Sequence, residues 1–202
     1  MEELGDHVVS AAISPDGRRL LCGKYGGPLE LWDLVTKEKL RTLHRRSDWY
    51  ETAIAPDGKH GVPVLSEATR LRVWELETGK VVRTFTYRGQ WRASTIAFSA
   101  DGIRMVAGSE GCLQVWDLRT GEEMCHLGVE GNVYGAVLTG DGGYTMSICG
   151  NKVIVWNLER GLEVCDFQND APFTCCSCSR DGSLLMAGDS SGGVHTFRLH
   201  YG

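Results

Sequence analysis

The chain is built from a unit of about 41 residues that recurs five times. An Asp-Gly pair marks each unit, and the aspartates of these pairs are Asp16, Asp57, Asp101, Asp141 and Asp181. An aromatic residue follows each pair, at Trp32, Trp74, Trp116, Trp156 and Phe197. Because two independent markers keep the same period along the chain, we expect the five units to be copies of one structural motif.

Each unit is predicted to form four short antiparallel strands. In the third unit, residues 93–99 have the alternation of a strand, and residues 100–102 (Ala-Asp-Gly) predict a hairpin turn. Residues 104–109 and 112–118 predict the next two strands, and residues 123–127 predict the outer one. Strands of this length with Gly-rich turns and without a helical period predict an all-β meander.

The units resemble WD40 repeats over nearly the whole chain. The stretches that carry the resemblance are Ser14-Pro15-Asp16-Gly17 with Leu31-Trp32-Asp33-Leu34, Ala55-Pro56-Asp57-Gly58 with Val73-Trp74-Glu75-Leu76, Ser99-Ala100-Asp101-Gly102 with Val115-Trp116-Asp117-Leu118, Asp141-Gly142 with Val155-Trp156-Asn157-Leu158, and Ser179-Arg180-Asp181-Gly182 with Thr196-Phe197-Arg198-Leu199. The resemblance implies a β-propeller with one four-stranded blade per repeat. We expect a single domain, 1–202, with repeats at 7–43, 49–87, 92–127, 132–167 and 171–199.

The repeats depart from the family in two ways. WD40 blades usually place an Asp six residues before the Trp, within a buried hydrogen-bonded network. That position here holds Gly26, Ala68, Glu110, Gly150 and Ser191. We therefore expect apolar packing to hold the blades together instead of that network. The fifth repeat also has no outer strand of its own, which predicts an incomplete last blade and a chain that is part of a larger ring. A closed five-blade ring is the alternative.

Composition limits the classes of partner and compartment. The chain has 21 Lys and Arg against 26 Asp and Glu, a net charge of −5, so no general attraction to nucleic acid is expected. No secretory signal and no apolar run of about 18 residues is present, so we expect no membrane span. The eight cysteines are expected to be free, buried thiols. These features predict a cytoplasmic protein, with the nucleus as the alternative.

Two connections between repeats combine arginine with aromatic residues, the composition that is enriched at protein interfaces. Their candidate partner-binding residues are Arg45, Arg46 and Trp49 in the first connection, and Arg88, Trp91 and Arg92 in the second. The alternative for Trp49 is an inward-facing core residue. The alternative for the arginines is a solvated rim.

Arg119 is a further candidate for partner binding. Trp116-Asp117-Leu118-Arg119 is similar to a pattern in WD40 substrate receptors of cullin-4 ubiquitin ligases, and an ordinary surface arginine is the alternative. Tyr87-Arg88-Gly89 is similar in part to the motif of phosphoinositide-binding propellers, which makes membrane binding another alternative.

Two stretches superficially suggest chemistry. Residues 188–193 are similar to the Gly-Asp-Ser-Gly-Gly motif of serine proteases with one serine inserted, but they occupy a predicted hairpin turn. Residues 175–178 (Cys-Cys-Ser-Cys) lack the second ligand pair of a zinc site. We expect no catalytic residues, no metal and no cofactor.

The sequence therefore predicts a non-catalytic WD40 scaffold for protein–protein interaction. Its divergent repeats are similar to the degenerate WD40 arrays at the C-terminal end of large NACHT-type signalling ATPases. This likeness implies that the chain is a segment of a larger signalling or regulatory protein.

Overall fold

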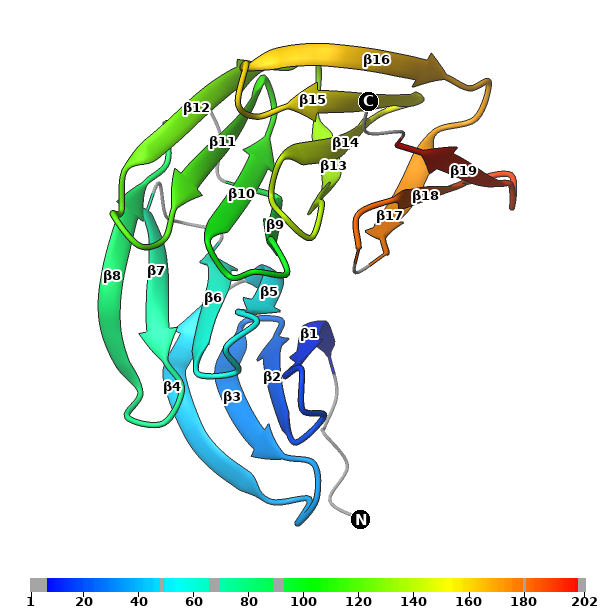
Figure 1. Cartoon of the computed structure of the whole chain (residues 1–202). Helices are drawn as coiled ribbons and strands as arrows, with labels where there is room; N and C mark the ends of the chain where they lie inside the picture. Colours follow the sequence, from blue (N-terminus) through cyan, green and yellow to red (C-terminus); the bar gives the residue numbers. More distant parts are fainter. Residues whose placement is uncertain (1–6, 48, 66–69, 89–92, 180, 200–202) are drawn as a thin grey trace. The chain divides into compact units, whose positions relative to one another are not determined.

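The structure is a computed structural model that describes residues 7–47, 49–65, 70–88, 93–179 and 181–199. These residues form 19 strands and contain no helix. The strands make five antiparallel sheets, numbered first to fifth along the chain (Figure 1). The chain divides into two compact units, Met1–Tyr87 and Arg88–Gly202. The prediction of an all-β fold built from five repeated sheets is confirmed.

The first unit holds two four-stranded sheets in which each strand pairs with its neighbours in sequence. The first sheet consists of β1 (Val8–Ile13), β2 (Arg19–Lys24), β3 (Gly27–Asp33) and β4 (Lys39–Ser47). The second sheet consists of β5 (Trp49–Ile54), β6 (His60–Leu65), β7 (Arg70–Glu75) and β8 (Lys80–Thr86).

The second unit holds two further four-stranded sheets and a last sheet of three strands. The third sheet consists of β9 (Thr95–Phe98), β10 (Arg104–Ser109), β11 (Cys112–Asp117) and β12 (Glu123–Gly128). The fourth consists of β13 (Val133–Leu138), β14 (Tyr144–Cys149), β15 (Lys152–Asn157) and β16 (Leu162–Gln168). The fifth consists of β17 (Phe173–Cys178), β18 (Leu184–Asp189) and β19 (Val194–Arg198), so the expected incomplete last blade is confirmed.

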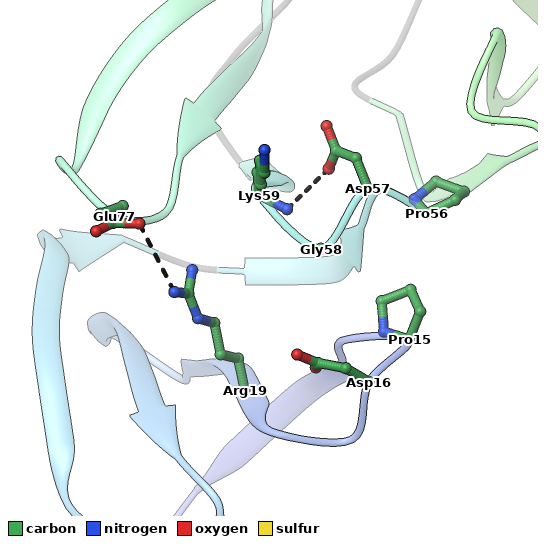
Figure 2. A pocket seen from close by; sticks show the side chains of 8 residues that line it. All are labelled: Pro15, Asp16, Arg19, Pro56, Asp57, Gly58, Lys59 and Glu77. Atoms are coloured by element: carbon green, nitrogen blue, oxygen red, sulfur yellow. Dashed lines mark hydrogen bonds and ion pairs between the residues drawn. The ribbon is translucent and has the colours of Figure 1, made fainter.

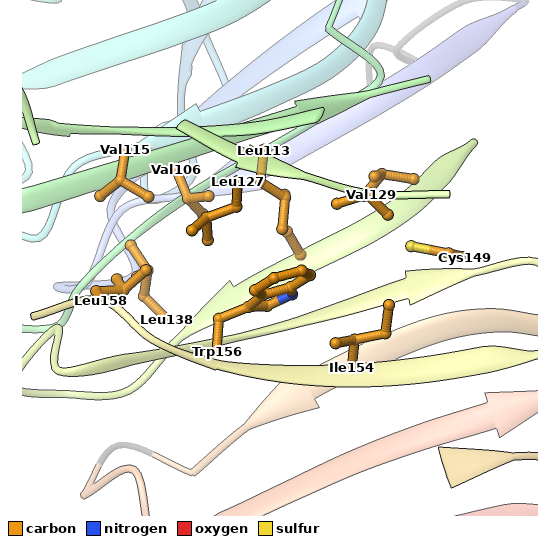
Figure 3. Close-up of a cluster of buried hydrophobic side chains, with 12 residues drawn as sticks. Val106, Leu113, Val115, Leu127, Val129, Leu138, Cys149, Ile154, Trp156 and Leu158 are labelled. Atoms are coloured by element: carbon orange, nitrogen blue, oxygen red, sulfur yellow. The ribbon is translucent and has the colours of Figure 1, made fainter. Parts of the chain in front are cut away.

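The core of the second unit lies between successive sheets. Figure 3 shows Trp156 of β15 among Leu113, Leu127 and Leu158, all of which are buried. The two middle strands of each complete sheet there are covered on both faces, which explains why β10 and β14 read as nearly continuous runs of small and apolar residues.

Neighbouring sheets within a unit also touch through the hydroxyls of their first strands. Ser10 Oγ of β1 lies 3.0 Å from Thr52 Oγ1 of β5. In the second unit, Thr95 Oγ1 of β9 accepts a hydrogen bond of 3.3 Å from the Ala136 backbone N–H of β13. These contacts satisfy polar groups in the crowded region where the first strands of adjacent sheets meet.

The Asp-Gly pairs form the turns between the first and second strands of each sheet. In the third sheet, Ser99 Oγ donates to Asp101 Oδ1 at 2.6 Å, and the Ile103 N–H donates to the same oxygen at 2.9 Å. Gly102 has a φ of 71°, a conformation that side chains disfavour. Serine or threonine two residues before the Asp makes the same bond in the first, fourth and fifth repeats.

The acidic or amide residue that follows each Trp stabilises a second turn. Asp33 Oδ1 accepts hydrogen bonds from the backbone N–H groups of Val35 and Thr36, at 2.7 and 2.9 Å. Asn157 accepts one from Arg160 in the fourth repeat. The Trp-Asp pair thus has two separate tasks, because the Trp fills the core while the Asp or Asn closes the turn.

The expectation that apolar packing replaces the buried polar network needs correction in three repeats. In the first, the Trp32 indole Nε1 donates to Glu30 Oε2 at 3.2 Å, and both side chains are buried. In the fourth, the Trp156 indole Nε1 donates to Ser147 Oγ at 3.1 Å, and both side chains are buried. In the fifth, Asp189 is the centre of a network described below. These polar contacts use positions other than the one six residues before the aromatic residue.

Candidate protein-interaction surface

A hollow of about 290 Å³ lies in the first unit, between the Asp-Gly turns of its two sheets. Figure 2 shows the side chains that line it. Its charged and proline residues are Pro15, Asp16, Arg19, Pro56, Asp57, Lys59 and Glu77. The hollow therefore combines both signs of charge with two rigid apolar rings.

Hydrogen bonds fix both aspartates of this hollow. Asp16 Oδ1 accepts from Ser14 Oγ at 2.5 Å and from the Arg18 N–H at 3.0 Å, and these bonds lower the pKa of Asp16. Partial burial alone would raise the pKa of Asp57. Hydrogen bonds outweigh this effect and lower the pKa, because His60 Nδ1 lies 2.5 Å from Asp57 Oδ2 and the Lys59 N–H donates to Asp57 Oδ1. Both carboxylates are therefore ionised at neutral pH.

The cationic side chains of the hollow are held less tightly. Arg19 Nη2 lies 3.8 Å from Glu77 Oε2, at the long end of an ion pair, and both side chains meet solvent. The Lys59 side chain is exposed. A partner can displace such contacts at little cost because exposed ion pairs contribute about 0–1 kcal/mol.

The first predicted connection is described only in part. Arg45 is exposed near the end of β4. Arg46 lies in β4 and Trp49 begins β5, but the side chains of both lie outside the described residues. Their proposed role in partner binding stays a prediction.

The second predicted connection is also described in part. Arg88 is exposed, its Nε lies 3.5 Å from Glu123 Oε2, and its backbone N–H donates to Gln114 Oε1 at 2.6 Å. Trp91 and Arg92 lie outside the described residues. Partner binding by Arg88, Trp91 and Arg92 stays a prediction.

Arg119 lies on the turn after β11 and is bound to a residue of its own repeat. Its Nη2 donates to Asp117 Oδ2 at 2.8 Å, and its Nε lies 3.4 Å from Asp117 Oδ1. This hydrogen bonding lowers the pKa of Asp117 to about 2 and raises that of Arg119. An acidic adaptor would have to compete with Asp117 for this guanidinium.

Sequence reasoning missed the network around Asp189. This carboxylate is buried in the hairpin between β18 and β19 and accepts hydrogen bonds from Ser191 Oγ (2.6 Å), the Gly193 N–H (2.9 Å) and Asn169 Nδ2 (2.8 Å). His195 Nε2 lies 2.8 Å from Asp189 Oδ2. Hydrogen bonds from Ser191 and His195 hold the pKa of Asp189 far below its usual range. The sequence signal for this network is an Asp two positions before Ser191, the residue six positions before Phe197, together with a His two positions before Phe197.

The same geometry explains the protease-like motif of residues 188–193. Ser191 Oγ donates to Asp189 Oδ1, whereas His195 contacts the other oxygen of that carboxylate. A nucleophilic serine instead needs its hydroxyl held by the base. The interpretation of this stretch as a hairpin turn is confirmed.

The cysteines are free thiols, but the expectation that they are buried is only partly correct. Cys22, Cys112 and Cys149 are buried, while Cys165 and Cys175 are exposed. The exposed thiols lie on edge strands of the fourth and fifth sheets, Cys165 on β16 and Cys175 on β17.

The described residues show neither a metal-binding cluster nor a membrane-spanning helix. They hold no group of three or more His, Cys, Asp or Glu side chains placed to bind a metal ion. They also form no helix with the length and apolar character that crossing a membrane requires.

Among the comparisons with known proteins, a family model matches one segment of the chain. A comparison with curated proteins gives no match. Residues 79–117 match the family model WD40: WD domain, G-beta repeat. This segment begins one residue before β8 and ends at the last residue of β11. This segment is therefore similar to a WD40 repeat, and the all-β fold of five antiparallel sheets is consistent with a WD40-type propeller.

Proposed function

We propose that this chain is a non-catalytic scaffold that binds protein partners through the short turns at the ends of its sheets, as a segment of a larger signalling or regulatory protein. The WD40 match at residues 79–117 supports a protein-interaction scaffold in general. The hollow of the first unit supports a specific place on that scaffold.

One observation carries the proposal: the turns that line the hollow are held by their own hydrogen bonds before any partner arrives. Ser14 and Arg18 fix Asp16, and Lys59 and His60 fix Asp57. Ordering loops on binding costs free energy, so loops that are already ordered leave more of the contact energy as affinity.

The charges of the hollow indicate what it binds. Asp16, Asp57 and Glu77 supply three carboxylates, and Arg19 and Lys59 supply two cations. A partner segment that carries a basic side chain beside an acceptor group complements this arrangement. The two prolines provide flat apolar contact for the stem of such a side chain.

The test begins with a photo-crosslinking residue in place of Lys59, which identifies the partner that contacts the hollow. The affinity of the purified partner is then measured for Lys59→Glu and Glu77→Lys. Glu38→Lys reverses a charge on another turn of the same unit and serves as the control. We expect each hollow variant to weaken binding about tenfold and the control to change it less than twofold. Equal affinity for all four proteins would contradict the proposed surface.

The alternatives from the sequence have their own tests. If Arg119→Ala abolishes co-purification of a cullin-4 adaptor, the receptor interpretation is favoured, and unchanged co-purification would remove it.

Flotation with liposomes that does not depend on phosphoinositide would remove the membrane interpretation. The NACHT-type parent and the cytoplasmic location remain proposals that the identity of the partner will test.

A further inference from the structure

The hollow of the first unit has an equivalent place in the second unit, between the Asp-Gly turns of the third and fourth sheets. Arg104 begins β10, three residues after Asp101, and its Nη1 donates a hydrogen bond to the carbonyl O of Gly142. A Cβ at Gly142 would lie 2.7 Å from Arg104 Cδ, so the arginine side chain fills this place closely. The second unit therefore shows which chemical group suits the space between two such turns, and that group is a guanidinium.

Arg104 also acts on the carboxylate of the turn that it contacts. Hydrogen bonds from the Gly143 N–H and the Thr139 hydroxyl are the main causes of the lowered pKa of Asp141, and the positive charge of Arg104 adds to them. The space between the two turns thus offers a guanidinium a carbonyl group that accepts a hydrogen bond and a carboxylate of opposite charge.

In the first unit, the equivalent place is open. Arg19 follows its turn as Arg104 does, but its Nη2 lies 3.8 Å from Glu77 Oε2, and Figure 2 shows its guanidinium turned toward that residue. Gly58 is the equivalent of Gly142, and in the described part of the chain no donor binds its carbonyl O. The hollow therefore borders a carbonyl group that has a guanidinium partner in the second unit and none in the first.

Two prolines explain why the turns of the first unit stay apart. In the second unit, the Asp101 N–H donates to the Gly140 carbonyl O at 3.1 Å and joins the two turns. Pro15 and Pro56 precede the aspartates of the first unit, where the second unit has alanine and glycine, and the described residues of the first unit form no such bond. Because rigid proline rings are larger than the groups they replace, they keep the hollow open.

The size and charge of the hollow fit a single cationic side chain. Pockets for drug-sized ligands measure about 300–1,000 Å³, whereas this hollow has a volume of about 290 Å³. Ser14 and Arg18 both bind Oδ1 of Asp16, so the other oxygen of this exposed carboxylate is open to a ligand. The three carboxylates of the hollow outnumber its two cations, which favours a positively charged occupant.

We propose that the hollow is a binding site for the guanidinium group of an arginine on a protein partner. This inference rests on the proposed scaffold function and names the residue that the partner inserts. The guanidinium donates to the carbonyl O of Gly58, as Arg104 does to that of Gly142, and its other N–H groups reach the carboxylates of Asp16 and Asp57. Five donors in one plane suit this combination better than the compact ammonium group of lysine.

The first test uses two small probes that differ only in their side chain, N-acetyl-arginine methylamide and N-acetyl-lysine methylamide. Each is titrated into the full chain while NMR follows the backbone amide shifts of Gly58 and Lys59. We expect a millimolar Kd for the arginine probe and about fivefold weaker binding of the lysine probe. No binding of the arginine probe, or equal affinity for the two probes, would overturn the proposal.

Matched asparagine variants locate the site. Asp16→Asn removes the charge but keeps the oxygen that accepts from Ser14 and Arg18. Asp101→Asn makes the same change on the equivalent turn of the second unit, where Arg104 already fills the space. We expect Asp16→Asn to weaken binding of the arginine probe about threefold and Asp101→Asn to change it by less than about 1.5-fold. Equal effects of the two variants would overturn the proposal.

Two results would assign the hollow to another arginine and so overturn the proposal. Binding of the arginine probe by Arg19→Ala alone, and not by the unaltered chain, would show that Arg19 fills the hollow in solution. A dimer of the chain that the arginine probe dissociates would identify an arginine of a second copy as the occupant.

The partner found by crosslinking at residue 59 separates this inference from the proposed function. We expect replacement of the arginines of its crosslinked segment by lysine to weaken binding about tenfold. If Lys59→Glu weakens binding of the partner but these arginine replacements do not, the scaffold function stands and the guanidinium site is wrong. If Lys59→Glu and Glu77→Lys leave binding unchanged, the proposed function itself fails.

Discussion

At the scale of single residues, side-chain hydrogen bonds decide which positions of the repeat tolerate change. The Trp156 indole and the Ser147 hydroxyl are both buried and bind each other at 3.1 Å, so each satisfies the other. Asp117 stabilises its turn through two backbone N–H groups and also binds Arg119. These two contacts lead to different predictions, because one is buried and the other is exposed.

Ser147→Ala should lower the free energy of unfolding by about 1–3 kcal/mol, since it leaves the buried Trp156 N–H without its acceptor. Urea denaturation of Ser147→Ala, Trp156→Phe and the double variant measures the coupling between the two positions. We expect Ser147→Ala to be less destabilising when residue 156 is Phe. An equal effect in both backgrounds would show that the hydrogen bond does not contribute.

Arg119→Ala should raise the pKa of Asp117 from about 2 toward its usual value of 3.8. The rise should be incomplete because the backbone N–H groups of residues 119 and 120 still donate to the carboxylate. A carboxyl group with a lowered pKa stabilises the folded state above pH 3.8, and that contribution is lost as the pH falls toward 2. Titration of the Asp117 carboxyl carbon by NMR measures this shift, and an unchanged pKa would show that the ion pair does not form in solution.

At the scale of strands and turns, the five repeats use similar turns, but the space around their glycines differs. Gly111 and Gly182 both have positive φ, at 83° and 73°. A Cβ at Gly111 would meet open space, whereas one at Gly182 would lie 2.7 Å from the Thr139 Cβ. Gly128 has neither a positive φ nor a neighbour within 4 Å of such a Cβ.

Alanine substitution should separate these effects by urea denaturation. Gly111→Ala should cost about 1 kcal/mol through the backbone alone. Gly182→Ala should cost about 3 kcal/mol because the methyl group also collides with the fourth sheet. Gly128→Ala, the control, should leave stability within about 0.5 kcal/mol. A Gly182→Ala protein as stable as Gly111→Ala would contradict the close approach of the two turns.

At the scale of the whole molecule, the repeat predicted the number of sheets, their strand order and the incomplete last sheet. It succeeded because the Asp-Gly and Trp markers each have a local physical task in every repeat. The polar contacts of Ser147, Asp189 and His195 were harder to predict, because they join residues on different strands or connections.

The central claim is that the described residues form five repeated antiparallel sheets, four of four strands and a last one of three. Hydrogen exchange of the backbone amides, resolved by NMR, tests this claim most directly through two equivalent third strands. β15 is paired on both sides and β19 on one side. We predict protected amides on alternate residues of β19, those that donate to β18, and on nearly all residues of β15. Equal protection along both strands, or protection patterns typical of helices, would contradict the account.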